Sequence, residues 1–371
     1  MNKIPLIKPY VTDEVKAKVC EVLDSAYLTE GPVTHELEEQ FRAFTGAKHA
    51  IAVTSCTTGL EIALRALDIG KGDEVIVPDY TYPATADVVE IVGAKIVIVD
   101  VSSDTMLVNY DALEKAITKK TKAIIPVSLF GNPLDYERLK KIKRKHKVAV
   151  IEDAACAIGA EYKGGKVGSF ADITVFSLHP RKFITTGEGG IITTDNTRWA
   201  EWMNSYKHFG MGKATAREAV RFKRIGTNYK LSNIQSAVGV VQMRHVDELL
   251  SRRRVLAAQY DRLLAGVPGV DIPVLTPGGV HSYQSYCVFL GPRNKALASL
   301  RSEGIEVQIG TYSLHMHAAF KANKNCRITG KMKGSRFAFD HCLALPLFHD
   351  LSANEQQRVV DGLSRILSQE G

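Results

Sequence analysis

Residues 173–195 have the sequence ITVFSLHPRKFITTGEGGIITTD. An apolar run typical of a strand ends at Ser177, a short polar loop carries Lys182, and a glycine-rich turn leads into a second apolar run. Glycine lets a backbone turn back tightly, so we expect the loop to be fixed between two buried strands. A lysine at the carboxyl end of a sheet, desolvated so that its pKa falls, is suited to be a Schiff-base nucleophile. On this segment alone, an ordinary surface lysine is an equally good interpretation.

Short apolar runs of this kind recur through the first half of the chain, and most lack polar–apolar alternation. They are residues 51–54, 74–78, 95–101, 123–130, 148–153, 173–177 and 190–194. Continuous apolar runs are typical of strands covered on both faces. Helical spacing of apolar residues lies between many of them, as at Leu60, Leu64 and Leu67. This alternation predicts an α/β domain with a mostly parallel sheet flanked by helices.

The pattern changes after Asn228. Ser232 and Gln235 form a capping-box signature that opens a long helical stretch towards Leu264, and a segment rich in proline and glycine follows at 266–279. The remainder mixes strand-like and helical pieces and ends in a predicted helix over 355–367. We therefore predict a large α/β domain over 1–245 and a smaller α+β domain over 246–371, with the option that the N-terminal segment packs on the smaller one.

Composition excludes several classes of protein. The chain has 371 residues, of which 45% are hydrophobic and 24% charged, so it can bury a large core without disulfides or metals. No apolar run approaches membrane-spanning length, and Pro9 comes too early for a signal-peptide core, so we expect a cytoplasmic protein that does not contact membranes. The six cysteines include no C-x-x-C pair, and we expect neither a metal site nor a disulfide framework.

The net charge of +8 suits nucleic acid or an anionic small substrate. The densest basic stretch, KKIKRKHK at 140–147, continues a helical pattern and has no interleaved aromatic residues. A solvated helix face explains it, and we do not expect nucleic-acid binding.

A second informative stretch is AVIEDAACAIGA, residues 149–160. Asp153 lies at the carboxyl end of an apolar strand. A buried carboxylate there needs a cationic partner, and the pyridinium nitrogen of pyridoxal phosphate (PLP) is one. A protonated ring nitrogen maintains the electron sink that stabilises a carbanion at an amino-acid Cα. The alternative is an aspartate that caps the next helix.

A third stretch, AVTSCTTGLEIALRAL at 52–67, turns from a strand into an amphipathic helix through Ser55, Cys56 and Thr57. Free N–H groups at the helix start, with hydroxyls beside them, make a natural phosphate cradle, to which Ser177 could add another hydroxyl. Plain N-capping by Thr57 or Ser55 is the alternative.

Tyr82 lies in a fourth stretch, VPDYTYPATAD at 77–87, between a strand and a helix. Its ring could stack on a planar cofactor. A half-buried packing tyrosine is the alternative interpretation.

Together, in this order and each at a strand end, the four stretches are more specific than any one alone. With GTNYKLSNIQSAVGVVQM at 226–243, they resemble the DegT/StrS-type sugar aminotransferases of the aspartate-aminotransferase fold (PLP fold type I). The segments SLHPRKFITTGEGG and IEDAACAIGA carry most of this resemblance, which extends over nearly the whole chain. It implies a mostly parallel seven-stranded sheet in the large domain.

The resemblance also implies roles for single residues. Lys182 would bind PLP as a Schiff base and move protons, and Asp153 would bind the pyridine nitrogen. Tyr82 would stack on the ring. The phosphate would be held by Thr57, Ser177 and backbone near Cys56. Asn228 would reach the phosphate of the neighbouring subunit's cofactor, which implies a homodimer with the active site at its interface.

Two cysteines depart from the family's pattern. Many members have glycine where this chain has Cys56, so a thiol must be tolerated beside the phosphate. Where this chain has Cys156, members often have glutamine or histidine near the ring hydroxyl, and a thiol is a weaker partner there.

Four further residues are candidate substrate contacts. Tyr312 and His315 match family positions near the sugar, and His179 and Arg181 are close to Lys182 in the sequence. A hydrogen-bonded structural role is the alternative for the histidines.

The predicted reaction moves an amino group from an amino acid, L-glutamate in the family's usual case, to a nucleotide-linked keto sugar by a ping-pong mechanism. The amino sugar would serve polysaccharide or secondary-metabolite biosynthesis. The alternatives are another PLP reaction such as elimination, and a non-catalytic sensor that binds PLP or a sugar nucleotide. A dinucleotide-dependent dehydrogenase would need a G-x-G-x-x-G after the first strand, which the chain lacks.

Overall fold

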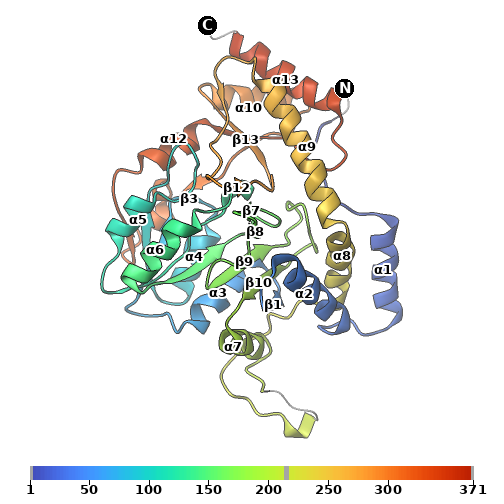
Figure 1. The fold of residues 1–371 in the computed structure, drawn as a ribbon, viewed down its shortest axis with the longest axis vertical. Helices are drawn as coiled ribbons and strands as arrows, with labels where there is room; N and C mark the ends of the chain where they lie inside the picture. Colours follow the sequence, from blue (N-terminus) through green and yellow to red (C-terminus); the bar gives the residue numbers. More distant parts are fainter. Residues whose placement is uncertain (1–2, 213–216, 369–371) are drawn as a thin grey trace.

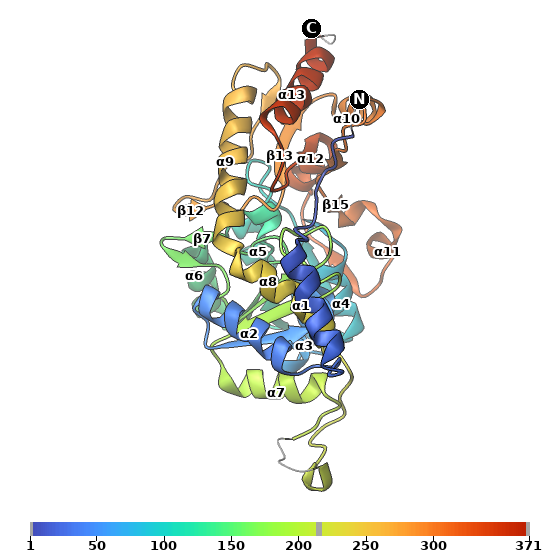
Figure 2. The ribbon, with the colours of Figure 1, turned by 90° about the vertical axis from the view of Figure 1, so that its right-hand side faces the viewer.

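The computed structural model describes residues 3–212 and 217–368. A large sheet with helices on both faces forms the lower part of the molecule in Figure 1, and a smaller group of strands and helices lies above it. Both ends of the chain lie at this upper part. The projecting segment, which is the described residues 208–212 and 217–232 between α7 (Thr197–Lys207) and α8 (Asn233–Arg244), lies at the opposite end (Figures 1 and 2).

The large sheet contains all seven predicted strands and one more. Its spatial order is β1 (His49–Val53), β10 (Gly190–Thr194), β9 (Ile173–Ser177), β6 (Ala149–Asp153), β5 (Thr121–Ile124), β2 (Glu74–Pro78), β4 (Lys95–Val99) and β16 (Cys326–Ile328). Strand β10 alone runs opposite to the other seven strands, so the predicted mostly parallel α/β fold is confirmed. The expected number of seven strands is wrong, because β16 from the C-terminal part pairs with β4 at the edge. The strand predicted over 123–130 ends at Ile124, and residues 129–131 form a short 3-10 helix, η1 (Leu129–Gly131).

Two apolar layers explain why the strands are apolar throughout. Successive residues of a strand face opposite sides of the sheet. Val150 and Ile191 belong to the core on one side, with side chains of α2, α6 and α8, whereas Ile151 and Ile192 belong to the core on the other side, with side chains of α3, α4 and α7. Both faces are therefore excluded from water.

The helices not yet bounded lie around this sheet and in the upper part of the molecule. They are α1 (Asp13–Asp24), α2 (Pro32–Thr45), α3 (Cys56–Ala66), α4 (Ala84–Ile91), α5 (Tyr110–Ala116), α6 (Tyr136–His146), α9 (Val246–Leu264), α10 (Arg293–Ser302), α11 (Ala318–Lys321), α12 (Lys333–His341), α13 (Ala353–Ser368), and the 3-10 helices η2 (Arg217–Ala219) and η3 (Leu314–Met316).

The upper part has its own apolar core and a four-stranded antiparallel sheet. The strands, in spatial order, are β11 (Val270–Asp271), β13 (Tyr286–Leu290), β17 (Cys342–Leu345) and β14 (Gln308–Ile309). Ile4 from the N-terminal segment is buried in this core beside Leu300 and Leu363. Two smaller sheets join β12 (Gly279–Val280), β7 (Glu161–Tyr162) and β8 (Gly165–Lys166), and β15 (Tyr312–Ser313) with β3 (Tyr80–Thr81).

Half of the predicted capping box at Ser232 is present, because the Ser232 hydroxyl accepts a hydrogen bond from the backbone N–H of Gln235 at 3.2 Å. The Gln235 side chain bonds to the Ser232 hydroxyl and to the carbonyl of Glu188, and not to the Ser232 backbone. The helical stretch that follows is two helices rather than one, because the chain departs from helical geometry at His245, between α8 and α9. The predicted C-terminal helix is α13.

Among residues 3–212 and 217–368, no helix is both long and apolar enough to cross a membrane. The same part of the chain holds no group of three or more His, Cys, Asp or Glu side chains arranged to bind a metal ion.

Gly190 allows β10 to run against the start of α3. A Cβ atom at this position would lie 2.6 Å from the carbonyl carbon of Ser55 and 2.7 Å from the backbone nitrogen of Cys56. We expect Gly190→Ala to lower the free energy of unfolding by about 1–3 kcal/mol, because backbone must shift to relieve the overlap. Chemical denaturation measures this change.

The control is Gly266→Ala, where an added Cβ atom has no neighbour within 4 Å. Equal stability losses in the two variants would contradict the close approach at Gly190.

Candidate active site

Most of the predicted site residues gather at one edge of the large sheet. Asp153 ends β6 and Ser177 ends β9, while the turn at Ser55 follows β1. These three strands run in the same direction, so their carboxyl ends meet at that edge. The carboxyl edge is where open α/β sheets bind their ligands.

Lys182 lies in the loop after β9, and its side chain is directed at the sulfur of Cys156. The Nζ atom donates a hydrogen bond to Sγ at 3.0 Å. Burial lowers the pKa of Lys182, but the sulfur atoms of Cys156 and Cys56 and the carboxylate of Asp153 raise it, and the net result lies above the ordinary value. The expectation of a lowered pKa is therefore wrong, because the neighbours outweigh desolvation.

Asp153 is buried and holds its carboxylate through two donors. The hydroxyl of Thr85 donates to Oδ2 at 2.7 Å, and the backbone N–H of Ala155 donates to Oδ1 at 3.1 Å. Burial raises the pKa of Asp153, and the hydrogen bonds from Thr85 and Ala155 and the charge of Lys182 act in the opposite direction. This carboxylate can accept a further cationic hydrogen-bond donor.

Cys56 is the first residue of α3, and its side chain is directed at Asp153. Its Sγ atom lies 3.9 Å from Oδ1 of Asp153 and 3.8 Å from the carbonyl oxygen of Val175. Burial and the charge of Asp153 raise the pKa of the thiol well above its usual value, so the group is neutral. The turn accommodates a thiol here because Sγ occupies space beside Asp153.

The start of α3 has unused backbone donors. Ser55 and Thr58 form a reciprocal capping box, with each hydroxyl accepting from the other residue's backbone N–H at 3.1 Å. Ser55, and not Thr57, is therefore the cap. In the part of the chain that the structure describes, the N–H groups of Cys56 and Thr57 have no hydrogen-bond partner. Such donors at a helix N-terminus are suited to bind a phosphate.

Ser177, expected near the same phosphate, is almost completely buried where β9 ends. Its hydroxyl accepts a hydrogen bond from the backbone N–H of His179 at 3.3 Å.

Tyr82 is strongly exposed, with 66% of its surface accessible, and its ring centroid lies 6.2 Å from that of Tyr312. The pairing of β3 with β15 brings these two rings together from opposite halves of the chain. Tyr312 therefore joins the site edge, and neither ring is a core packing residue.

His315 is held by Asp79, a fully buried carboxylate that directly follows β2. Its Nδ1 atom lies 2.6 Å from Oδ2, and its backbone N–H donates to Oδ1 at 2.7 Å. The pair fixes the orientation of the imidazole, and Asp79 was not predicted.

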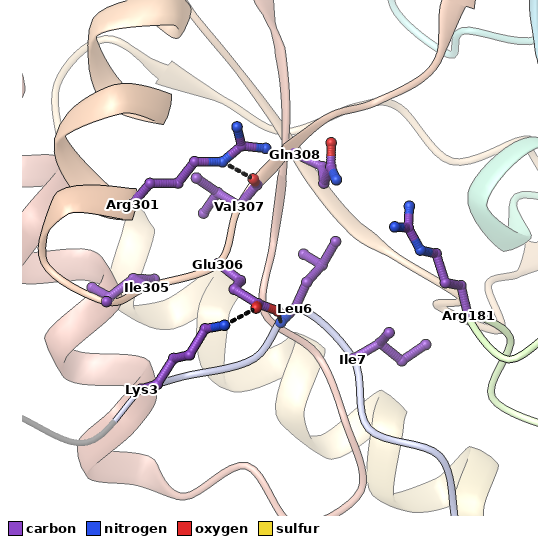
Figure 3. Close-up of a pocket in the computed structure, with 10 residues that line it drawn as sticks. Lys3, Leu6, Ile7, Arg181, Arg301, Ile305, Glu306, Val307 and Gln308 are labelled. Carbon is purple, nitrogen blue, oxygen red and sulfur yellow. Dashed lines mark hydrogen bonds and ion pairs between the residues drawn. The ribbon is translucent and has the colours of Figure 1, made fainter.

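His179 and Arg181 lie on the lysine loop, and their side chains do not contact Lys182. The Nδ1 atom of His179 accepts from the backbone N–H of Arg181 at 3.2 Å, and Nε2 lies 3.8 Å from Glu188. Burial lowers the pKa of His179. Arg181 instead points into a cavity beside the N-terminal segment (Figure 3).

Asn228 lies at the base of the projecting segment between α7 and α8. It is exposed, its Oδ1 atom accepts from Lys230 at 2.6 Å, and its backbone bridges to His208. Within the described residues it makes no recorded contact with Lys182 or Asp153. The site formed by this chain therefore does not include it.

The family model for the DegT/DnrJ/EryC1/StrS aminotransferases matches residues 9–364. The chain belongs to this aminotransferase family.

Solved structures of similar proteins cover nearly the whole chain. The candidate sugar aminotransferase Spr1654 from Streptococcus pneumoniae, in its PMP form, is 30% identical with a TM-score of 0.93, over 99% of this chain and 98% of that one. A PLP form of the same protein matches with a TM-score of 0.92. DesV from S. venezuelae, in complex with a ketimine intermediate, is 31% identical with a TM-score of 0.92, over 98% of each chain. PseC from Helicobacter pylori, an aminotransferase involved in pseudoaminic acid biosynthesis, is 28% identical with a TM-score of 0.93, over 99% of this chain and all of that one.

Gln284 is a further residue of the aminotransferase site that sequence patterns do not reveal. Its amide nitrogen donates to the carbonyl of Arg181 at 2.8 Å, and its amide oxygen accepts from the N–H of Phe183 at 3.1 Å. One buried side chain thus holds the backbone on both sides of Lys182. Gln284 is about a hundred residues away along the sequence, and no local motif marks it.

We expect Gln284→Ala to impair the aminotransferase in two ways. The N–H of Phe183 loses its partner inside the protein, which costs about 1–3 kcal/mol of stability. The loop also loses the hydrogen bonds that position Lys182, so kcat falls roughly tenfold or more. Thermal unfolding and steady-state kinetics measure the two effects, with Gln357→Ala on the exposed face of α13 as control. An unchanged kcat in a folded variant would show that the loop needs no such support.

We expect Cys156→Ala to lower the pKa of Lys182, because it removes the sulfur that accepts from Nζ. Only the neutral amine attacks an aldehyde, so the raised pKa makes the rate of PLP binding by the apoprotein increase with pH. In the variant this rise should move to lower pH. The measurement is the binding rate followed by visible absorption across pH, with the exposed Cys20→Ala as control. Superimposable profiles would rule out this effect of Cys156.

Proposed function

We propose that the chain binds PLP through Lys182 and transfers an amino group from L-glutamate to a nucleotide-linked keto sugar. The observation that carries the proposal is the set of three groups at one sheet edge: the amine of Lys182, the buried and only partly compensated carboxylate of Asp153, and the free N–H donors of α3. They correspond to the aldehyde, the ring nitrogen and the phosphate of PLP. Because these described residues fit the cofactor, its site in this chain is the edge formed by β1, β6 and β9.

Asp153 and Lys182 would divide the chemical work. PLP supplies an electron sink for the carbon that carries the amino group. Asp153 would keep the ring nitrogen protonated, and the cation would in turn compensate its buried charge. The Nζ atom of Lys182 would take the proton from the substrate carbon that carries the amino group. It would return a proton when the amino group passes to the acceptor. Cys156 and Gln284 would keep Nζ and its loop in position for this step.

The phosphate and ring contacts follow from the same geometry. The N–H groups of Cys56 and Thr57, the Thr57 hydroxyl and Ser177 would hold the phosphate, and Tyr82 would cover the ring. Tyr312 and His315 would contact the sugar, since β15 brings them to the same edge. Spr1654 is named as a sugar aminotransferase and PseC as an aminotransferase involved in pseudoaminic acid biosynthesis, which supports an amino-sugar product. That product would enter polysaccharide or secondary-metabolite biosynthesis.

The functional unit would be a homodimer. Phe222 and Ile225 on the projecting segment are 64% and 94% exposed, an unusual state for large apolar side chains that a second copy would cover. This segment would carry Asn228 to the phosphate of the partner's cofactor. All six cysteines are free, which suits work in the reducing cytoplasm.

We also propose that two domains divide near residue 245. The helix break at His245 supports this boundary. Before it, α8 packs with α1 and α2; after it, Leu256 and Tyr260 of α9 belong to the core of the four-stranded sheet.

The test is the visible spectrum of the purified protein with PLP, before and after L-glutamate. We expect the wild type to develop the absorption of a lysine-bound cofactor and to lose it when glutamate is added. Release of 2-oxoglutarate beyond one equivalent per site should then depend on a keto-sugar acceptor. Lys182→Ala should show neither change, while Lys141→Ala, on the exposed face of α6, should behave as the wild type.

Three outcomes would count against parts of this proposal. Absence of a Lys182-dependent band would leave a non-catalytic sensor. A band that glutamate does not alter would exclude glutamate as the donor. Repeated release of ammonia without an acceptor would indicate elimination.

A further inference from the structure

A cavity of about 420 Å³ lies between the N-terminal segment, the lysine loop and the upper part of the molecule. Figure 3 shows Arg181 and Arg301 approaching it from two sides, with Leu6 and Ile7 between them. Its walls also include Lys3, Ile305, Glu306, Val307 and Gln308. The cavity has the size of a small-molecule site, and polar and apolar groups contribute to its walls in similar measure.

The cavity carries an excess of positive charge. Its lining contains three cationic side chains and one carboxylate, which leaves a net of two positive charges. The carboxylate of Glu306 is already engaged: Lys3 lies 2.6 Å from Oε1, and the backbone N–H of Leu6 donates to Oε2 at 3.0 Å. Lys3 and Leu6 lower the pKa of Glu306, so it stays ionised and holds Lys3. Arg181 and Arg301 are therefore the cations open to a ligand.

The two arginines are placed differently. Arg301 donates from Nε to the carbonyl of Val307 at 2.9 Å, which holds the guanidinium beside β14 and leaves its terminal nitrogens for other acceptors. Arg181 is the residue directly before Lys182, and its carbonyl is held by Gln284. A ligand bound by Arg181 is thus anchored on the same loop that carries the reactive amine.

We propose that this cavity binds the diphosphate of the nucleotide-linked acceptor, with Arg181 and Arg301 as its ligands. The inference rests on the proposed function and adds to it the site of substrate recognition. Planar guanidinium groups bind phosphate oxygens in pairs, and two ionised phosphates match the net charge of the lining. Glutamate differs from smaller amino donors by one side-chain carboxylate. Bound in this cavity, that single negative charge would leave one of the two net positive charges of the lining unbalanced. Leu6, Ile7 and Ile305 provide apolar surface for the rest of the nucleotide.

The test is calorimetric titration of the PLP-loaded protein with UDP, dTDP, GDP and inorganic diphosphate. We expect at least one nucleoside diphosphate to bind the wild type, and Arg181→Gln to weaken it roughly tenfold or more through loss of a charged hydrogen-bonding pair. Arg144→Gln on the exposed face of α6 removes the same charge outside the cavity and should leave binding unchanged. Arg301→Gln should also weaken binding, provided that its thermal unfolding matches the wild type.

A second measurement separates the diphosphate from a carboxylate. In Arg181→Gln, the half-saturating concentration of glutamate, read from the loss of visible absorption, should stay at the wild-type value, whatever the rate of that step. If glutamate half-saturation rises instead, the cavity serves the amino donor and the proposal is wrong. It is equally wrong if no nucleoside diphosphate binds the wild type, or if Arg181→Gln binds as tightly as Arg144→Gln.

The proposed function and the assignment of this cavity are tested by different measurements. If the wild type binds PLP but does not react with glutamate, the proposed transamination is wrong. Nucleotide binding that depends on Arg181 can still be measured in the same protein. If the wild type reacts with glutamate but binds no nucleoside diphosphate, only the assignment of this cavity as the diphosphate site is wrong.

Discussion

The carboxylate of Asp153 is the constraint around which the candidate site is arranged. It is buried at the end of β6, where an unpaired charge would be costly, and the two donors from Thr85 and Ala155 compensate it only in part, since its pKa stays raised. The remaining compensation must come from a cation in front of the carboxylate. Lys182 supplies some of it, and the protonated ring nitrogen of the proposed cofactor would supply the rest. The same unmet charge thus favours the free Lys182 ammonium and prepares the site for a cationic heterocycle.

The parts of the site that the sequence reveals are those carried by one strand and the turn after it. Asp153, Ser177, Lys182 and the turn at Ser55 each follow an apolar run, and parallel strands bring such positions to one edge without further information. Gln284, Thr85 and Asp79 were missed for the opposite reason. Each side chain forms a hydrogen bond with a residue far away in the sequence, and no local sequence pattern predicts that partner. The predicted direction of the Lys182 pKa shift was wrong for the same reason, because the shift depends on two sulfur atoms and a carboxylate from other elements.

The differences in the fold have similar causes. The edge strand β16 has three partly buried residues, too short for a periodic signal, and it exists because β4 offers an unpaired edge. The single long helix expected after Ser232 is broken at His245, and α9 then passes from the core of the large sheet, at Leu249 and Leu250, to that of the small one, at Leu256. Local propensity does not record that change of packing partner. By contrast, the apolar runs of the large sheet were predictable because both faces are covered by helices.

The helix α9 and the residues just before β13 hold the lysine loop through a chain of buried hydrogen bonds. Arg253 of α9 donates to the carbonyls of Tyr283 and Gln284 at 2.7 and 2.8 Å, and Gln284 in turn holds the residues on both sides of Lys182. Burial lowers the pKa of Arg253 to about 9, so the guanidinium remains charged at neutral pH and its bonds to carbonyl oxygens stay strong. Arg301 and Gln308 reach the cavity from the same upper part of the molecule. The position of the amine and the shape of the anion cavity therefore depend on one packing arrangement, and a shift of the small sheet would alter both together.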